Sequence, residues 1–166
     1  MIPQKIIFGI DRKEISHFTS IELHQTINDH HTFTIKVPHS VIEKPRAYTM
    51  ENAQNWLGKT VHIQLENKNN FLGIITNIEL DFNLDHVGSQ IILTGFSKTI
   101  LLESGTKMHS WEDTTLQDMV REDIKSGANE QLQNEIQPEF THKINYQTQY
   151  EETDFQYIQR LAKQYN

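Results

Sequence analysis

Histidine and carboxylate side chains are the groups in this 166-residue chain that could most readily do chemistry: it has nine histidines and 22 acidic residues. His30 and His31 are adjacent, and adjacent residues of a strand point to opposite faces, so the two rings cannot share a metal ion. No His-x-x-x-His pair lies on a predicted helix, and His24, His62 and His86 fall on predicted polar faces or loops. We therefore predict that the protein has no metal site.

Two pairs of neighbouring carboxylates, Glu112-Asp113 and Glu151-Glu152, have the composition of an acid–base pair. Each pair stands at a predicted helix start, where the positive end of the helix dipole stabilises negative charge without any catalytic role. The chain also lacks a Gly-x-Ser-x-Gly nucleophile turn and a glycine-rich phosphate loop, and it has seven glycines in all. We therefore predict that the protein is not an enzyme and uses no cofactor.

The composition narrows the class of protein further. Without cysteine, the chain has neither disulfides nor thiolate metal ligands. Its net charge of −7 and its scattered lysines and arginines argue against nucleic-acid binding, which needs clustered positive charge. No apolar run approaches the ~20 residues that cross a bilayer, and the N-terminal residues lack the pattern of a signal peptide. We therefore expect a cytoplasmic protein with no membrane anchoring.

Alternating apolar and polar residues predict antiparallel strands through the first hundred residues. Residues 17–37 indicate one long hairpin that turns at Asn28-Asp29, and further turns or loops are expected at 67–70 and 85–88. Strands joined mainly by hairpins are typical of a closed or split antiparallel barrel rather than of a parallel sheet. The predicted strands are 5–10, 17–27, 31–37, 61–65, 74–82 and 90–96.

The same alternation predicts the core of this region. A short helix from 49 or 50 to 57 should interrupt the strands and end at Gly58. Its inward side chains should be Ala53, Trp56 and Leu57. The side chains expected to share the apolar faces of the strands are Ile21, Leu23, Ile27, Phe33, Ile35, Val37, Val61, Ile63, Leu65, Ile74, Thr76, Ile78, Leu80 and Phe82.

Two helices are predicted in the second part of the chain. Each opens with a capping box, in which a threonine and a glutamine three residues later bond to each other's backbone amides. The first box pairs Thr114 with Gln117, and its helix should end at Gly127 in a left-handed conformation. The second box pairs Thr153 with Gln156. The apolar residues at helical spacing are Leu116, Met119, Val120 and Ile124, then Phe155, Ile158, Leu161, Ala162 and Tyr165.

Three stretches resemble signature sequences of VgrG proteins, the spike proteins of type VI secretion, and of related phage tail-hub proteins. Tyr-Glu-Glu-Thr-Asp-Phe-Gln-Tyr-Ile-Gln-Arg-Leu-Ala at 150–162 is similar to the stretch that opens the second barrel in that family. Gly-Phe-Ser-Lys-Thr-Ile-Leu-Leu-Glu at 95–103 resembles the end of the first barrel, and Trp-Glu-Asp-Thr-Thr-Leu-Gln-Asp-Met-Val at 111–120 resembles the start of the connecting helix. The resemblance implies structural roles for Leu116, Val120, Tyr150, Glu152, Phe155, Arg160 and Leu161.

Together, the residues and the resemblance predict a mainly β fold with some α. An antiparallel split β-barrel at 1–104 should be followed by a connecting helix region at 105–137 and by the start of a second barrel at 138–166. The segment 99–111 looks irregular and should end the first barrel, and a strand at 143–150 should lead into the last helix. Because the resemblance implies further strands after that helix, we expect the sequence to be part of a longer protein, with the apolar face of the last helix covered by other structure.

The resemblance also implies an assembly function. A VgrG-like hub is a structural component of a contractile injection machine: it forms a homotrimer and adapts a hexameric, Hcp-like tube protein to a trimeric spike. Spike-tip or effector proteins are further implied partners. Such a protein is assembled in the cytoplasm and then delivered out of the cell with the apparatus.

Two other classes of protein stay open at this point. A stand-alone small β-barrel that binds a peptide or an oligosaccharide would carry a cluster of exposed aromatic side chains on one face. Most aromatic residues here occupy inward positions, which argues against that class. An enzyme fragment would need titratable groups that converge in a pocket.

Overall fold

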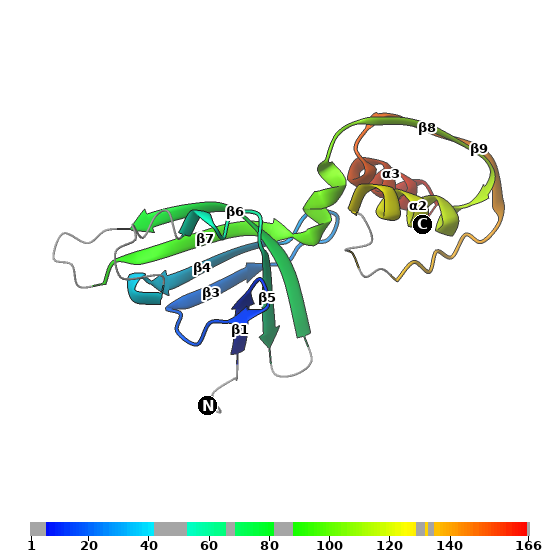
Figure 1. Cartoon of the computed structure of the whole chain (residues 1–166). Coiled ribbons are helices and arrows are strands. Elements are labelled where there is room, and N and C mark those ends of the chain that lie inside the picture. Colours follow the sequence, from blue (N-terminus) through cyan, green and yellow to red (C-terminus); the bar gives the residue numbers. More distant parts are fainter. Residues whose placement is uncertain are drawn as a thin grey trace. The chain divides into compact units, whose positions relative to one another are not determined.

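The structure is a computed structural model, in which the chain forms two compact units, Met1–Ser97 and Lys98–Asn166. Figure 1 shows a curved sheet in the first unit, and helices beside a long two-stranded ribbon in the second. The described residues are 6–41, 53–65, 69–81, 88–128, 132 and 135–165.

The N-terminal unit contains a single antiparallel sheet. Its strands are β1 (Ile6–Ile10), β2 (Lys13–Glu14), β3 (Ser20–His24), β4 (Thr32–Pro38), β5 (Thr60–Leu65), β6 (Asn69–Asp81) and β7 (Gln90–Ser97), and a short 3-10 helix, η1 (His39–Val41), follows β4. The strand order is β2-β1-β5-β6-β7-β4-β3, and β3 with β4 forms the predicted hairpin. The sheet is curled into a half-barrel (Figure 1), which confirms the prediction of a mainly β fold with an antiparallel split barrel.

Alternate residues of these strands form the core, as the two-residue period predicts. In β4, for example, Phe33, Ile35 and Val37 are buried, whereas the residues between them are partly exposed. Ile21 and Leu23 of β3 pack against the same core. The buried residues are Phe8, Ile10, Phe33, Ile35, Val37, Ala53, Val61, Ile63, Phe71, Ile75, Ile91 and Leu93.

A bulge in β6 changes which side chains this strand directs inward. Ile75 is buried, and the pairing of β6 with β7 then shifts between Ile75 and Asn77. The extra residue, Thr76, reverses the alternation. Beyond it the even-numbered Ile78 and Leu80 pack against the core, whereas before it the odd-numbered Ile75 is the buried residue. The inward prediction is therefore confirmed for Ile78 and Leu80 and wrong for Ile74 and Thr76, and Phe82 lies outside the described residues.

Two other side chains that were predicted to face inward are exposed. Ile27 is 91% exposed, because β3 has already ended and the chain turns at Asn28, whose φ is 64°. Leu57 is 53% exposed. Its amide donates to the backbone oxygen of Gln54 at 3.0 Å, and this three-residue spacing stacks Leu57 over the exposed Gln54 rather than over the buried Ala53.

The helix predicted at 49–57 is described only at its end. Ala53 and Gln54 are helical, Ala53 is buried, and Trp56 packs against the core. Gly58 follows with a φ of 75°, the left-handed conformation predicted for the end of this helix. Residues 42–52, and most of the predicted turns at 67–70 and 85–88, lie outside the described residues.

The C-terminal unit combines two helices with a two-stranded antiparallel ribbon (Figure 1). Its elements are η2 (Lys98–Glu103), β8 (Lys107–Thr115), α2 (Leu116–Ala128), β9 (Lys143–Glu152) and α3 (Asp154–Tyr165). The sequence predicted β9 and both helices but missed β8, and the expectation of irregular chain at 99–111 was wrong. Trp111 is the single buried residue of β8, so this strand lacks the apolar alternation that marks the others.

The starts of the two helices were predicted with different success. α3 has the predicted capping box: the Gln156 amide donates to Thr153 Oγ1 at 3.1 Å, and the Thr153 amide donates to Gln156 Oε1 at 3.2 Å. α2 begins one residue later than predicted, because β8 stays paired with β9 through Thr115. The amide of Asp118 therefore donates to Thr115 Oγ1, at 3.2 Å, and not to the hydroxyl of Thr114.

Three further residues near α2 differ from the prediction. Glu112 and Asp113 belong to β8 rather than to a helix start, so the acidic residue in the first turn of α2 is Asp118 instead. Gly127 is not a left-handed cap, because it is helical within α2. A Cβ at this position would overlap Asp154 Oδ2, so the glycine permits a close approach of α2 to α3.

A second hydrophobic core lies between α2, α3 and the ribbon. Tyr157 was not predicted to lie in the core, yet it is fully buried, and its hydroxyl donates to Met119 Sδ at 3.8 Å. Phe155 was predicted to face inward and is half-buried. The core residues are Trp111, Leu116, Met119, Val120, Ile144, Tyr157 and Leu161.

No helix in the described part of the chain has the length and apolar character needed to cross a membrane.

Candidate functional site

Arg160 ties α3 to β9. Its Nε donates to both carboxylate oxygens of Glu152, at 2.9 and 3.1 Å, and its Nη2 donates to the backbone oxygen of Thr148 at 2.6 Å. The guanidinium also lies 5.1 Å from the centre of the Tyr157 ring, within the range of a cation–π contact. Because the planar guanidinium makes these contacts at once, it fixes the direction in which the helix leaves the strand.

Asp154, the buried first residue of α3, is the centre of a polar cluster. Its Oδ2 accepts a hydrogen bond from Lys107 Nζ at 2.5 Å, and its Oδ1 accepts one from Gln149 Nε2 at 3.1 Å. Lys107 Nζ also donates to Ser126 Oγ at 3.0 Å. Since the four side chains come from β8, β9, α2 and α3, the cluster connects every long element of the unit. We call these four residues the polar cluster.

A second carboxyl group, that of Asp123 in α2, is buried near the polar cluster. Burial first, and then the charge of Asp154, raise the pKa of Asp123 from 3.8 to about 7, while Lys107 acts in the opposite direction. Burial also raises the pKa of Tyr157 above its ordinary range, and Asp123 contributes to this shift. At neutral pH, Tyr157 is therefore an uncharged phenol and Asp123 is close to the midpoint of its titration.

The ribbon exposes three large side chains on one face. Met108, Tyr146 and Tyr150 are 71%, 60% and 60% exposed. Met108 is paired directly with Tyr150 across the ribbon, and strand alternation places Tyr146 on the same face, opposite the buried Trp111 and Gln149. We call Met108, Tyr146 and Tyr150 the outer ribbon face. Within the described part of the chain, neither outer edge of the ribbon is paired with another strand, and exposed apolar groups on such a ribbon are typical of a surface that associates with other protein.

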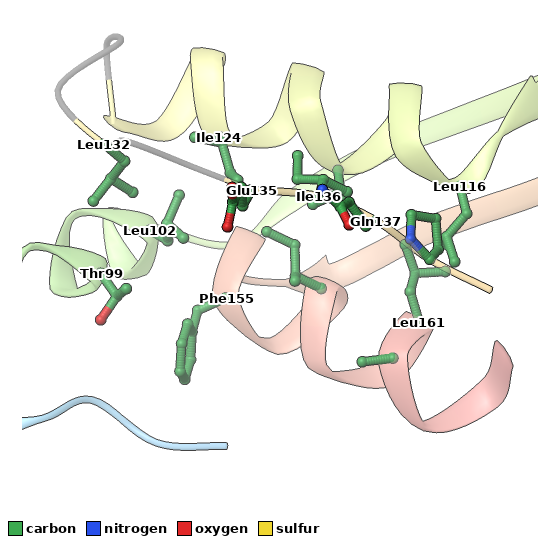
Figure 2. Close-up of a pocket in the computed structure, with 14 residues that line it drawn as sticks. Thr99, Leu102, Leu116, Ile124, Leu132, Glu135, Ile136, Gln137, Phe155 and Leu161 are labelled. Atoms are coloured by element: carbon green, nitrogen blue, oxygen red, sulfur yellow. The ribbon is translucent and has the colours of Figure 1, made fainter. Parts of the chain in front are cut away.

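A groove of about 480 Å³ lies between α2 and α3. Figure 2 shows Leu102 and Phe155 toward one end of it, and Leu116 and Leu161 toward the other. The lining is mainly aliphatic, so the groove suits an apolar side chain rather than a charged substrate.

Among the residues that the structure describes, no three histidine, cysteine or acidic side chains are grouped to hold a metal ion, and His86 lies outside them.

The structure places the seven residues singled out by the resemblance in different settings. Leu116, Val120 and Leu161 are core residues, Glu152 and Arg160 bond to each other, Phe155 lines the groove, and Tyr150 is exposed on the outer ribbon face.

Sequence reasoning missed the polar cluster and Asp123. Lys107 and Gln149 lie in strands whose polar residues carry no periodic signal, and Asp123 follows the exposed Glu122 in a helix with many polar residues. Asp154 lies in the first turn of a predicted helix, where the helix dipole favours an acidic residue whether it is buried or exposed, so its type gave no signal of the cluster. The contacts between elements, rather than the local sequence, bring these groups together.

The exposed aromatic side chains belong to the ribbon and not to the sheet of the N-terminal unit. Within the described part of that unit, the exposed large hydrophobic residues are Ile27, Leu57 and Leu72, and none of them is aromatic. The sheet therefore does not show, over these residues, the aromatic cluster expected of a barrel that binds a peptide or an oligosaccharide.

Comparisons with known proteins identify relatives of this architecture. A model of the family described as phage tail baseplate hub (GPD) matches residues 24–166. Curated protein sequences gave no significant match.

Several solved structures are similar to the chain. The 43 kDa tail protein of prophage MuSo2 from Shewanella oneidensis has a TM-score of 0.71 at 13% identity, over 98% of this chain and 48% of that one. An Escherichia coli component of the type VI secretion system, described as structurally similar to the T4 bacteriophage tail proteins gp27 and gp5, has a TM-score of 0.66 at 13% identity, over 93% and 42%. A tail protein from Neisseria meningitidis MC58 has a TM-score of 0.65 at 13% identity, over 96% and 45%. The chain thus has the fold of these proteins and spans less than half of their length.

Proposed function

The chain belongs to the phage tail baseplate hub family, and from this membership we propose that it is a structural hub component of a contractile injection machine of the VgrG-like, type VI secretion kind. The observation that carries the proposal is the family match over residues 24–166, which spans most of the N-terminal unit and all of the C-terminal unit. The likeness in fold to phage tail proteins and to a type VI secretion component, along nearly the whole chain, supports it further.

The chemistry of the C-terminal unit supports a role in assembly rather than in catalysis. Two ion pairs hold its elements together: Arg160 bonds to Glu152, and Lys107 bonds to Asp154. The groove between α2 and α3 is mainly aliphatic. Side chains that are held in this way stabilise a rigid shape, which is what a hub contributes to a machine whose force is generated elsewhere.

We propose the domain organisation that the resemblance implies: a first hub β-barrel at 1–104, a connecting helix region at 105–137 and the start of a second barrel at 138–166. The succession of β9, the Thr153 cap and α3 supports the last part, since it is the strand-and-helix opening expected there. In this proposal, the seven residues of the resemblance are structural. Leu116, Val120 and Leu161 build the C-terminal core, Glu152 and Arg160 fix α3 on β9, Phe155 lines the groove, and Tyr150 lies on the outer ribbon face.

The proposed partners follow from the hub role. The whole protein forms a homotrimer, adapts a hexameric, Hcp-like tube protein to a trimeric spike, and carries spike-tip or effector proteins when the apparatus is delivered out of the cell. The outer ribbon face supports an assembly of this kind. Exposed Met108, Tyr146 and Tyr150 offer apolar and aromatic area that gains stability when other protein covers it.

A co-purification experiment with the cognate tube protein tests the proposal on the whole protein. Wild type is compared with a Tyr146→Ser/Tyr150→Ser variant and with a matched control, Leu57→Ser/Leu72→Ser, which removes exposed apolar groups from the N-terminal unit instead. We expect wild type and control to be trimers that retain the tube protein, and the ribbon variant to lose the trimer while keeping its circular dichroism spectrum.

Two outcomes would contradict this. A wild-type protein that stays monomeric and does not retain the tube protein would remove the adaptor role. Tight, stoichiometric binding of a peptide or an oligosaccharide by such a monomer would favour the stand-alone binding module.

A further inference from the structure

Asp123 is buried beside an ion pair that is already complete, that of Lys107 with Asp154. Asp154 is fully buried, and both of its carboxylate oxygens accept hydrogen bonds, one from Lys107 and one from Gln149. Lys107 is thereby committed to Asp154 and to Ser126. A negative charge on Asp123, which is 2% exposed, would be a second buried anion beside a single cation.

Two buried oxygen atoms in this region have no hydrogen-bond donor when Asp123 is a carboxylate. Asp123 Oδ2 and Gln149 Oε1 are both buried, and neither has a hydrogen-bond partner. Two buried acceptors without donors are unfavourable, because each has lost its hydration. A protonated carboxyl group carries no charge, so a single proton on Asp123 removes the buried charge that would otherwise have no partner.

We propose that Asp123 is a protonated carboxylic acid in the folded protein below neutral pH, and that loss of this proton as the pH rises weakens the packing of α2 against α3 and β8. The groups that face Asp123 agree with this assignment. Asp154 on α3 and Glu122 on α2 oppose an anion, Lys107 on β8 favours one, and Tyr157 on α3 stays uncharged. A buried carboxyl group therefore makes the C-terminal unit sensitive to pH around neutrality.

The direction of the effect follows from the linkage between protonation and folding. The pKa of Asp123 is about 7 when folded, against the ordinary value of 3.8. The folded state then binds the proton more strongly than the unfolded state, so the contribution of this group to stability is greatest below about pH 4, falls as the pH rises from about 4 to about 7, and changes little above that. A difference of about three units corresponds to an upper limit of about a thousand-fold in the unfolding equilibrium.

Asp123→Asn is the decisive variant, because the amide keeps the shape and a donor but cannot ionise. The test is chemical unfolding between pH 5 and pH 9 at fixed ionic strength, in a Trp56→Phe background so that the fluorescence of the remaining tryptophan, Trp111, reports the C-terminal unit. In wild type we expect the unfolding midpoint to fall from pH 5 to about pH 7 and to level off toward pH 9. In Asp123→Asn we expect a flatter profile and a stability above that of wild type at pH 9. Glu112→Gln, at an exposed position of β8 that is not among the charges acting on Asp123, should keep the wild-type slope.

A direct titration keeps the proposal testable even if the variant does not fold. The side-chain carboxyl carbon of Asp123, assigned by nuclear magnetic resonance in wild type, should titrate well above the ordinary range of aspartate. Titration of Asp123 near pH 4 would overturn the proposal, as would an Asp123→Asn variant that folds and keeps the wild-type pH slope.

Discussion

Gly127→Ala is the substitution for which the structure predicts a result opposite to the general rule. Within a helix, replacing glycine by alanine normally stabilises a protein by up to about 1 kcal/mol, because the glycine loses more backbone freedom on folding. At position 127, however, the new methyl group would overlap Asp154 Oδ2 and lie 3.1 Å from Leu102 Cδ2. The close approach of α2 to α3 leaves no space for it.

The expected magnitude follows from what must move. Forcing an extra methyl group into a packed core typically costs about 1–3 kcal/mol. Displacing Asp154 also strains its bonds to Lys107 and Gln149, and weakening a buried hydrogen bond to a charged group adds about 1–2 kcal/mol. After the gain in helix propensity is subtracted, we expect a net destabilisation of about 2 kcal/mol, or a fall in melting temperature of about 10 °C for a unit of this size.

The assay is equilibrium unfolding in guanidinium chloride, followed by fluorescence in a Trp56→Phe background so that the remaining tryptophan, Trp111, reports the C-terminal unit alone. A control pair repeats the substitution in an Asp154→Ala background, where the penalty of Gly127→Ala should shrink because its main obstacle is gone. A Gly127→Ala protein as stable as its parent, or an equal penalty in both backgrounds, would refute the reasoning.

Three further comparisons use the same unfolding measurement. Arg160→Met should destabilise the C-terminal unit by about 1–2 kcal/mol, since it removes the bonds to Glu152 and Thr148, whereas Lys163→Met on the exposed side of α3 should have less than half that effect. Thr115→Ala should cost about 1 kcal/mol through loss of the α2 cap, and a larger effect of Thr114→Ala would contradict the assigned helix start. Ile35→Ala should destabilise the N-terminal unit by about 2–4 kcal/mol, because Ile35 is buried, and Ile27→Ala by less than about 0.5 kcal/mol, because Ile27 is exposed. Equal effects would contradict the assignment of Ile27 to the surface.

The strands that sequence predicted best are those with one buried and one exposed face. Phe33, Ile35 and Val37 alternate with polar residues, and this pattern states both the strand and its inward side. β6 was predicted as a strand with the wrong inward residues in its first part, because the bulge at Thr76 is marked by no unusual residue type. β8 was missed because a ribbon exposed along most of its length needs few apolar residues, and Trp111 alone carries no period.

The polar groups of the C-terminal unit were predictable only in part. The resemblance singled out Glu152 and Arg160 without stating that they bond to each other, which depends on the angle between β9 and α3. Nothing in the local sequence distinguishes the buried Asp123 from the exposed Glu122 beside it. Its burial is decided by the packing of α3 and β8 over α2, and Gly127, which was interpreted as a helix end, is the residue that permits this packing.

The most direct test of the proposed hub role is the location and copy number of the protein in contractile particles purified from the cell that produces them. Electron cryomicroscopy of these particles should show the protein at the end of the tube, in three copies, with the outer ribbon face covered by neighbouring protein. Particles that assemble a complete tube and spike without this protein, or that contain it in another number at another place, would contradict the account.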